Sequence, residues 1–185
     1  GGLGFSDITP MNGTDGVVLS GTTYSWVIDT NNSSSDITGG SSGNGPTILG
    51  SVLQNASNSP QDLTYTVTPT SGDNCEGEDF TVTITVNPEP QINNVTQTIC
   101  NGEFTVLPED GVNGDVVLTG TTYTWGTPVS TPDVVTGGSA GTDQSSISQT
   151  LSNPTSSPAT LIYTVTPTSG DNCEGEDFTV TITVN

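Results

Sequence analysis

Tyr65-Thr-Val-Thr-Pro-Thr-Ser-Gly-Asp-Asn-Cys-Glu-Gly-Glu-Asp-Phe-Thr-Val-Thr-Ile-Thr-Val-Asn87 is the stretch that decides the fold, and it recurs without a change as residues 163–185. From Phe80 to Val86, apolar side chains alternate with threonines. Alternation with a period of two among β-branched residues is typical of a half-buried antiparallel strand. The residues from Leu63 to Val67 alternate in the same way. The block therefore predicts a β-hairpin whose loop contains the turn formers of residues 69–79.

The copied block is one part of a longer repeat. Gly21-Thr-Thr-Tyr-Ser-Trp26 matches Gly120-Thr-Thr-Tyr-Thr-Trp125, and Ile37-Thr-Gly-Gly-Ser41 matches Val135-Thr-Gly-Gly-Ser139. Similarity at a fixed period is the signature of modules in tandem. The sequence predicts two domains, residues 1–87 and residues 88–185. The prolines of Asn87-Pro-Glu-Pro90 mark the linker, because proline resists both helix and sheet pairing.

The first copy has no counterpart of Glu89–Ile99. Its first strand is therefore expected either to lie outside this sequence or to be absent. Both ends of the chain are expected to be cut from a longer array of the same module.

The strand signals along each copy predict an all-β sandwich. No window has a helical period, and the expected strands number about six or seven per module, as a sandwich of roughly 100 residues requires. Pro69 and Pro167 are expected to mark the points where the first strand of each hairpin leaves the ladder. The strands expected besides 80–86 and 178–184 are residues 5–8, 22–28, 48–53 and 63–67 in the first copy, and 92–99, 104–107, 116–118, 121–125, 146–151 and 161–165 in the second.

The excess of acidic residues limits the kinds of molecule that the chain can bind. The chain contains 20 acidic residues and no Lys, Arg or His, so its net charge is −20. Nucleic acids and anionic lipids are excluded as partners, because both are bound through cationic side chains. No apolar run approaches the ~18 residues of a membrane-spanning helix, so membrane insertion is not expected. Cations, neighbouring repeats of the parent chain, surface glycans and other surface proteins remain as candidate partners.

The same composition argues against catalysis. A Ser, Thr or Cys nucleophile needs a neighbouring base, and the chain has no His or Lys to act as one. Only a pair of carboxylates of the glycosidase type remains chemically possible, and nothing in the spacing singles out such a pair. The sequence therefore predicts a protein that is not an enzyme.

The loop of each predicted hairpin carries four acidic residues. Hard cations such as Ca²⁺ take six to eight oxygen ligands from flexible loops. The spacing matches no known Ca²⁺ loop, so a solvated acidic hairpin is the alternative interpretation. The candidate Ca²⁺ ligands are Asp73, Glu76, Glu78 and Asp79 in the first copy and Asp171, Glu174, Glu176 and Asp177 in the second.

Three cysteines leave at least one thiol unpaired. Cys75 and Cys173 are equivalent, and Cys100 stands near the start of the second copy. A Cys100–Cys173 disulfide would close a bridge inside one module. A bridge between modules, or no bridge, is the alternative, because a disulfide needs Cα atoms within ~7 Å and these positions are expected at opposite ends of a sandwich.

The two tryptophans also admit two interpretations. Trp26 and Trp125 could form aromatic platforms for a sugar ligand. A tryptophan on the third strand of a sandwich is, however, the usual centre of its packing. The first interpretation predicts exposed indoles and the second predicts buried ones.

Several motifs of the second copy together resemble a known family: Thr98-Ile-Cys-Asn-Gly-Glu103, Tyr163-Thr-Val-Thr-Pro-Thr168 and Asn172-Cys-Glu-Gly-Glu-Asp177, with the Trp125 and Ser139 motifs quoted above. The chain is similar to the PKD-like, immunoglobulin-like repeats of giant Bacteroidota surface proteins, among them gliding-motility adhesins of the SprB type exported by the type IX secretion system. The resemblance implies two tandem immunoglobulin-like sandwiches and no catalytic residues. It also implies a location outside the cell, attached to the outer membrane.

From these observations we expect a non-catalytic structural and adhesive stalk segment of a long cell-surface filament, in which length grows with the number of repeats. The alternative is a carbohydrate- or ligand-binding sandwich module, with or without dependence on Ca²⁺. The residues that would contact an adhesive ligand are not evident from the sequence.

Overall fold

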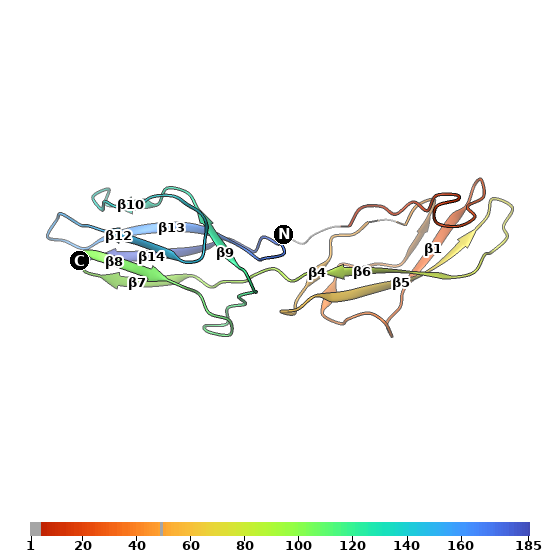
Figure 1. Ribbon diagram of the computed structural model, residues 1–185, viewed down its shortest axis with the longest axis horizontal. Helices are drawn as coiled ribbons and strands as arrows, with labels where there is room; N and C mark the ends of the chain where they lie inside the picture. The colour runs from red at the N-terminus through yellow and green to blue at the C-terminus, as the bar shows by residue number, and fades with distance from the viewer. Residues whose placement is uncertain (1–4, 49) are drawn as a thin grey trace. The chain divides into compact units, whose positions relative to one another are not determined.

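The computed structural model describes residues 5–48 and 50–185, and these form strands and loops without any helix (Figure 1). The chain divides into two compact units between Pro88 and Glu89, one residue from the boundary expected from the sequence. We call residues up to Pro88 the first unit and Glu89–Asn185 the second unit. Within the described residues there is no helix of the length and apolarity needed to cross a bilayer.

The second unit is a sandwich of two sheets. All strand pairs in it are antiparallel except the pair of β14 and β7, which is parallel and lies at one edge of the main sheet. Its main sheet has the order β11-β9-β13-β14-β7, with β10 paired to β13, and β12 pairs with β8 in the other layer. The strands are β7 (Val95–Ile99), β8 (Gly102–Val106), β9 (Thr122–Trp125), β10 (Val129–Thr131), β11 (Gly141–Gln144), β12 (Ile147–Leu151), β13 (Ala159–Thr168) and β14 (Phe178–Val184).

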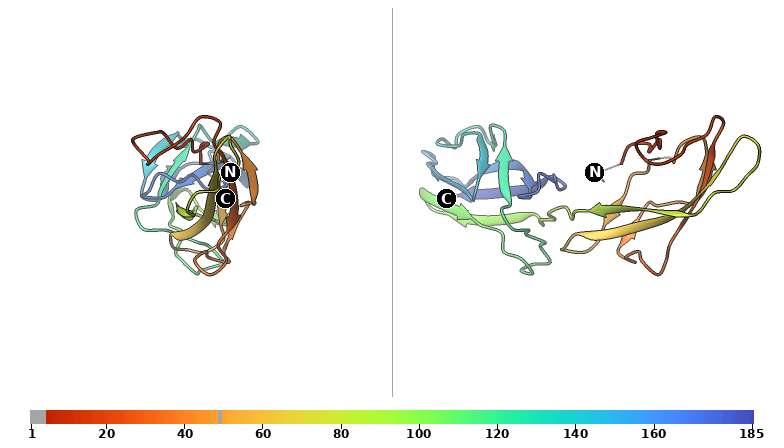
Figure 2. Two further views of the ribbon diagram at one scale, coloured as in Figure 1. Left: turned by 90° about the vertical axis from the view of Figure 1, so that its right-hand side faces the viewer. Right: turned by 45° about the vertical axis from the view of Figure 1, so that its right-hand side comes forward.

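The first unit repeats this plan with fewer paired residues. Its main sheet has the order β3-β1-β5-β6, and β2 pairs with β4 (Figures 1 and 2). A single bridge between Ile8 and Ile48 takes the place of the β8–β12 pair. The strands are β1 (Thr23–Ile28), β2 (Ile37–Thr38), β3 (Gly43–Gly45), β4 (Gln54–Asn55), β5 (Gln61–Thr70) and β6 (Phe80–Val86).

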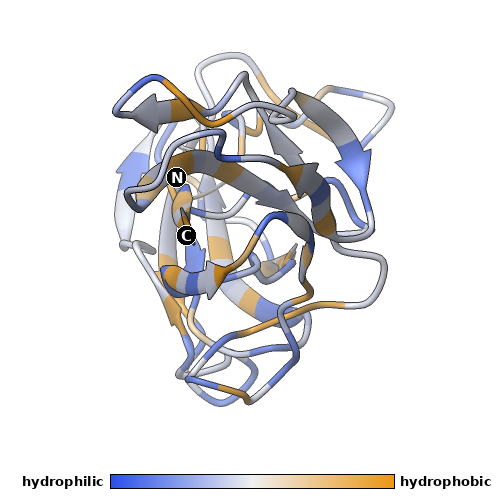
Figure 3. Cartoon of the chain, turned by 90° about the vertical axis from the view of Figure 1, so that its left-hand side faces the viewer, coloured by the Kyte–Doolittle hydropathy of each residue, from blue (hydrophilic) through white to orange (hydrophobic). Residues whose placement is uncertain are grey.

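Each unit has its own apolar core. Apolar and polar residues alternate along the strands that build it (Figure 3). In the second unit, Tyr163, Val165 and Val180 are completely buried and pack with Trp125. The core of the first unit contains the equivalent residues of β1 and β5. Two cores in one all-β chain confirm the predicted fold class, two tandem immunoglobulin-like sandwiches.

The duplicated hairpin has the same local geometry in both units. Asn74 and Asn172 adopt positive φ angles of 61° and 60°, a conformation that asparagine tolerates better than most residues. The serine three residues earlier accepts a hydrogen bond from each asparagine's N–H, at 2.9 Å in the first unit and 3.0 Å in the second. The loop conformation is thus determined within the copied block itself.

Candidate functional site

The acidic loops lie at the tips of the β5–β6 and β13–β14 hairpins, and all eight predicted Ca²⁺ ligands are exposed. In each loop, one carboxylate is already engaged by the sheet. Asp79 accepts a hydrogen bond from the Thr68 hydroxyl at 2.6 Å, and Asp177 accepts one from Thr166 at 2.5 Å. These bonds tie the last acidic residue of each loop to the neighbouring strand.

The acidic side chains are not gathered into a ligand set. Across residues 5–48 and 50–185, no three Asp, Glu or Cys side chains are grouped so that they could hold a metal ion. A Ca²⁺ site of useful affinity requires six to eight oxygens around one point. Binding of Ca²⁺ at the loops therefore stays a prediction, and it would need the loops to rearrange.

The prediction of a Cys100–Cys173 disulfide is wrong, since Cys75, Cys100 and Cys173 are all free thiols. Cys100 follows Ile99, which pairs with Val184 at the end of β14, whereas Cys173 precedes the start of that strand. The seven residues of β14 separate these two levels by roughly 20 Å. This is far beyond the ~7 Å that a disulfide can span.

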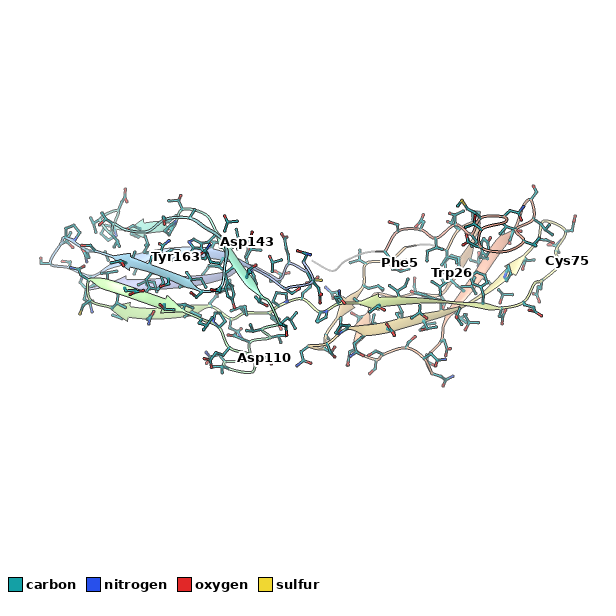
Figure 4. All side chains as sticks on the ribbon, viewed as in Figure 1. Phe5, Trp26, Cys75, Asp110, Asp143 and Tyr163 are labelled. Carbon is teal, nitrogen blue, oxygen red and sulfur yellow. The ribbon has the colours of Figure 1, made fainter. Side chains whose placement is uncertain are left out.

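The tryptophans are packing centres and not exposed platforms. Trp26 and Trp125 are only 4% and 5% exposed (Trp26 in Figure 4). Each indole N–H donates to a backbone carbonyl, that of Ser41 at 3.1 Å and that of Ser139 at 2.9 Å. The structure therefore gives a sugar no indole face to stack on, and the packing interpretation is confirmed.

Two buried tyrosines, Tyr123 and Tyr163, are part of the core of the second unit. Burial raises the pKa of Tyr123 to about 12, and the negative charge of Asp115 adds to the shift. Burial also raises the pKa of Tyr163, whose hydroxyl donates to the side-chain oxygen of Gln149 at 2.9 Å (Tyr163 in Figure 4). Both phenols are neutral at physiological pH, so neither can act as a base. The buried Tyr123 hydroxyl has no hydrogen-bond partner among the described residues.

A surface cavity of about 310 Å³ lies beside β7 and β8 in the second unit and is lined in part by two carboxylates, Glu109 and Asp115. Asp115 is only 5% exposed, and it accepts hydrogen bonds from the backbone N–H and side-chain amide of Asn93, at 2.8 and 3.3 Å. That carboxylate fixes the segment before β7 to the neighbouring loop. It is thus a structural group, which the sequence pattern did not single out because its partner is 22 residues away.

The strand order, the buried tryptophan and the loops at the strand ends define the class of protein as a tandem immunoglobulin-like β-sandwich. A family model described as a PKD-like domain matches residues 7–90 and again residues 97–185, so the chain belongs to the PKD-like domain family. Such domains are typically extracellular adhesive or structural modules and are generally non-catalytic. A comparison with curated proteins found no match.

Proposed function

We propose that this chain is a structural and adhesive stalk segment of an extracellular surface protein. The observation that carries the proposal is the identical 23-residue block, which folds twice into the same hairpin within two separate cores. A protein built by copying one module gains length without needing a new site in each copy. Membership of the PKD-like family supports the same function.

The composition supports exposure to a surface environment. With no Lys or Arg, the chain offers trypsin-like proteases no cleavage site even when a unit opens. The dense negative charge keeps neighbouring filaments apart through repulsion that acts over a Debye length of ~8 Å. Both properties suit a filament that must stay extended and intact outside the cell.

The finer assignment that we propose is a repeat of a giant Bacteroidota adhesin exported by the type IX secretion system and used in gliding. Its support is the set of motifs shared with such repeats, from Thr98 to Asn185. In the source bacterium, antibodies against the repeat should label intact cells. Labelling that persists after deletion of the secretion channel would exclude this finer assignment.

The mechanical function is tested by pulling the chain from its two ends in a single-molecule instrument. Two separate unfolding events are expected, each releasing roughly 30 nm of chain, because ~90 residues extend at about 3.6 Å each. One event of about twice that length would mean that the two units do not resist force independently. A neutral-glycan array run in parallel should show no binding, since both indoles are buried.

A further inference from the structure

The duplicated block places one sequence in two different environments. In β14, the inward residues Phe178, Val180 and Ile182 are buried, and the burial alternates perfectly along the strand. In β6, the equivalent Phe80, Val82 and Ile84 are only half-buried, although every neighbour in the block is identical. The difference must therefore come from outside the block.

The missing contact is a neighbouring strand. In the second unit, β7 runs parallel to β14, with Val95 opposite Val180 and Ile99 opposite Val184. Val95 and Ile99 pack against the core, which completes the burial of β14. Among the described residues, β6 pairs only with β5, so its other edge is open.

The hydrogen bonds of backbone N–H groups also distinguish the edge of β14 from that of β6. In the second unit, the Thr179 N–H donates to the side-chain oxygen of Asn94 at 2.7 Å, and the Asn185 N–H donates to the Ile99 carbonyl at 2.9 Å. The equivalent N–H groups in β6 belong to Thr81 and Asn87. Among the described residues, no hydrogen bond is found from these two N–H groups. An edge with such N–H groups beside half-buried apolar side chains is a template for an added strand.

The loop beside the edge shows the same contrast. Cys173 is 1% exposed, whereas the equivalent Cys75 is an exposed residue at the tip of its hairpin (Figure 4). The segment before β7 covers the second loop, because the Pro90 carbonyl lies directly against Gly175. In the first unit, nothing described covers Gly77 in this way.

We propose that the open edge of β6 is an acceptor site for a parallel β-strand with the chemistry of residues 88–99. The occupant is an extended segment with apolar residues at the places of Val95 and Ile99, no acidic residue in the part that pairs with β6, and a proline-containing start that covers the Cys75 loop. It pairs in the register of the second unit, so those two positions lie opposite Val82 and Val86.

Two observations favour such a segment over a second molecule of this chain: the repulsion between two acidic chains, and the lack of an unpaired β7 that a second molecule could donate. Each copy carries a net charge of −20, and its β7 is already paired with its own β14. Exchange of β7 between copies would open one edge for each edge it closes. Residues 90–99 contain no acidic side chain, so a strand of this kind approaches β6 without added repulsion.

The test uses the full chain carrying Cys100→Ser and a synthetic peptide of residues 88–100 with serine at its last position. Alkylation followed by intact mass should show one fast thiol, Cys75, and one slow thiol, Cys173. Saturating peptide should slow the fast thiol at least about tenfold and protect the amides of β6 from hydrogen exchange to a similar degree.

Two matched peptides separate strand addition from non-specific contact. A peptide with Val95→Ser and Ile99→Ser should lose the protection, whereas one with Thr96→Ser and Thr98→Ser on the exposed face should keep it. As a second measurement, the same alkylation and hydrogen exchange are followed in a chain with residues 88–100 fused ahead of Gly1. Fusion makes the pairing intramolecular, so a low affinity of the free peptide no longer limits the result.

Equal effects of the two peptides would overturn the proposal, as would the absence of protection by both the free and the fused segment. Sedimentation of the chain alone gives the remaining outcome. A dimer in which Cys75 is protected without peptide would mean that the edge accepts another copy, and the proposed occupant would be wrong.

Discussion

Alanine at one glycine of the duplicated block should act differently in the two units. At Gly175, an added Cβ would lie 1.9 Å from the Pro90 carbonyl oxygen. At the equivalent Gly77, it would meet only Pro69, whose ring carbon lies at 3.1 Å. The Pro167 ring lies at a similar 3.2 Å from the added Cβ at Gly175, so the Pro90 carbonyl is the main difference between the sites.

The magnitude follows from what must move. A carbon cannot approach a backbone oxygen to 1.9 Å, so Gly175→Ala must displace the segment that leads into β7. Forcing extra volume into a packed site costs about 1–3 kcal/mol. Gly77→Ala needs only a small shift of the proline ring, and alanine stabilises by about 0.4–1 kcal/mol where it fits, because it restricts the unfolded chain. The two effects nearly cancel at Gly77.

Calorimetry of both variants measures the difference. Gly175→Ala should lower the Tm of the second unit by roughly 4–24 °C, since 1 kcal/mol corresponds to about 4–8 °C in a domain of this size. Gly77→Ala should change the Tm of the first unit by only a few degrees. Hydrogen exchange read on peptides from residues 23–55 and 122–151, which are unique to each unit, assigns each transition.

Equal destabilisation by the two substitutions would refute the reasoning, because it would place the cost inside the shared hairpin and not in the contact with Pro90. The double variant provides a control. Its effect should be the sum of the single effects, as expected for sites without shared partners.

Three further predictions concern the core and the charge. Acrylamide, a neutral quencher, should quench the tryptophan fluorescence of the native protein far less than that of the unfolded protein, and efficient quenching of the native protein would contradict the packing described. Trp125→Ala should destabilise its unit by about 3–5 kcal/mol. The pKa of Tyr123 is raised from 10 to about 12, so stability that is complete below pH 10 should be lost as pH rises through 12, by roughly 2–3 kcal/mol; Tyr123→Phe should lose less in a urea titration at each pH. Ca²⁺ and Mg²⁺ at matched ionic strength should raise the Tm equally, since both only screen repulsion; a larger rise with Ca²⁺ would indicate a specific site at the loops.

The hairpin strands could be predicted from the sequence because their information is local. The expected bounds of residues 80–86 and 178–184 are confirmed as β6 and β14. The alternation is regular, and each loop contains an asparagine suited to a positive φ angle. The weaker segments were wrong where pairing is not local: residues 116–118 contribute only a bridge from Val116 to Gln91, and the described residues of the segment 48–53 form no continuous strand.

The prolines of the hairpins were expected to mark the points where their strands leave the ladder, and this is correct only for the ladder of the hairpin itself. β13 continues to Thr168, with Pro167 opposite Tyr123. The Pro167 carbonyl accepts from the Gly175 N–H, so the polar groups of this residue face the hairpin loop. The ladder with β14 has already ended there, at Val165. The missing N–H of proline therefore removes no bond from the sheet.

A glycine- and serine-rich stretch also proved to be a strand. β11 begins at Gly141, where an added Cβ would lie 2.4 Å from the Trp125 ring. The glycine is therefore needed because the indole packs flat against the backbone of the next strand. Composition alone predicts a flexible loop, since the requirement comes from a side chain 16 positions earlier in the sequence.

The candidate sites also depend on contacts between segments that are distant in the sequence. Whether an indole is a platform or a core residue depends on which strands face it, and strand order is a property of the whole unit. The duplicated block makes this physical point without any comparison to another protein. Its 23 residues determine the hairpin, the turn and the alternation in both units, yet Val82 is half-buried and Val180 is completely buried. Local sequence thus determines which face of a strand is apolar, whereas the presence of β7 determines whether that face is fully removed from water.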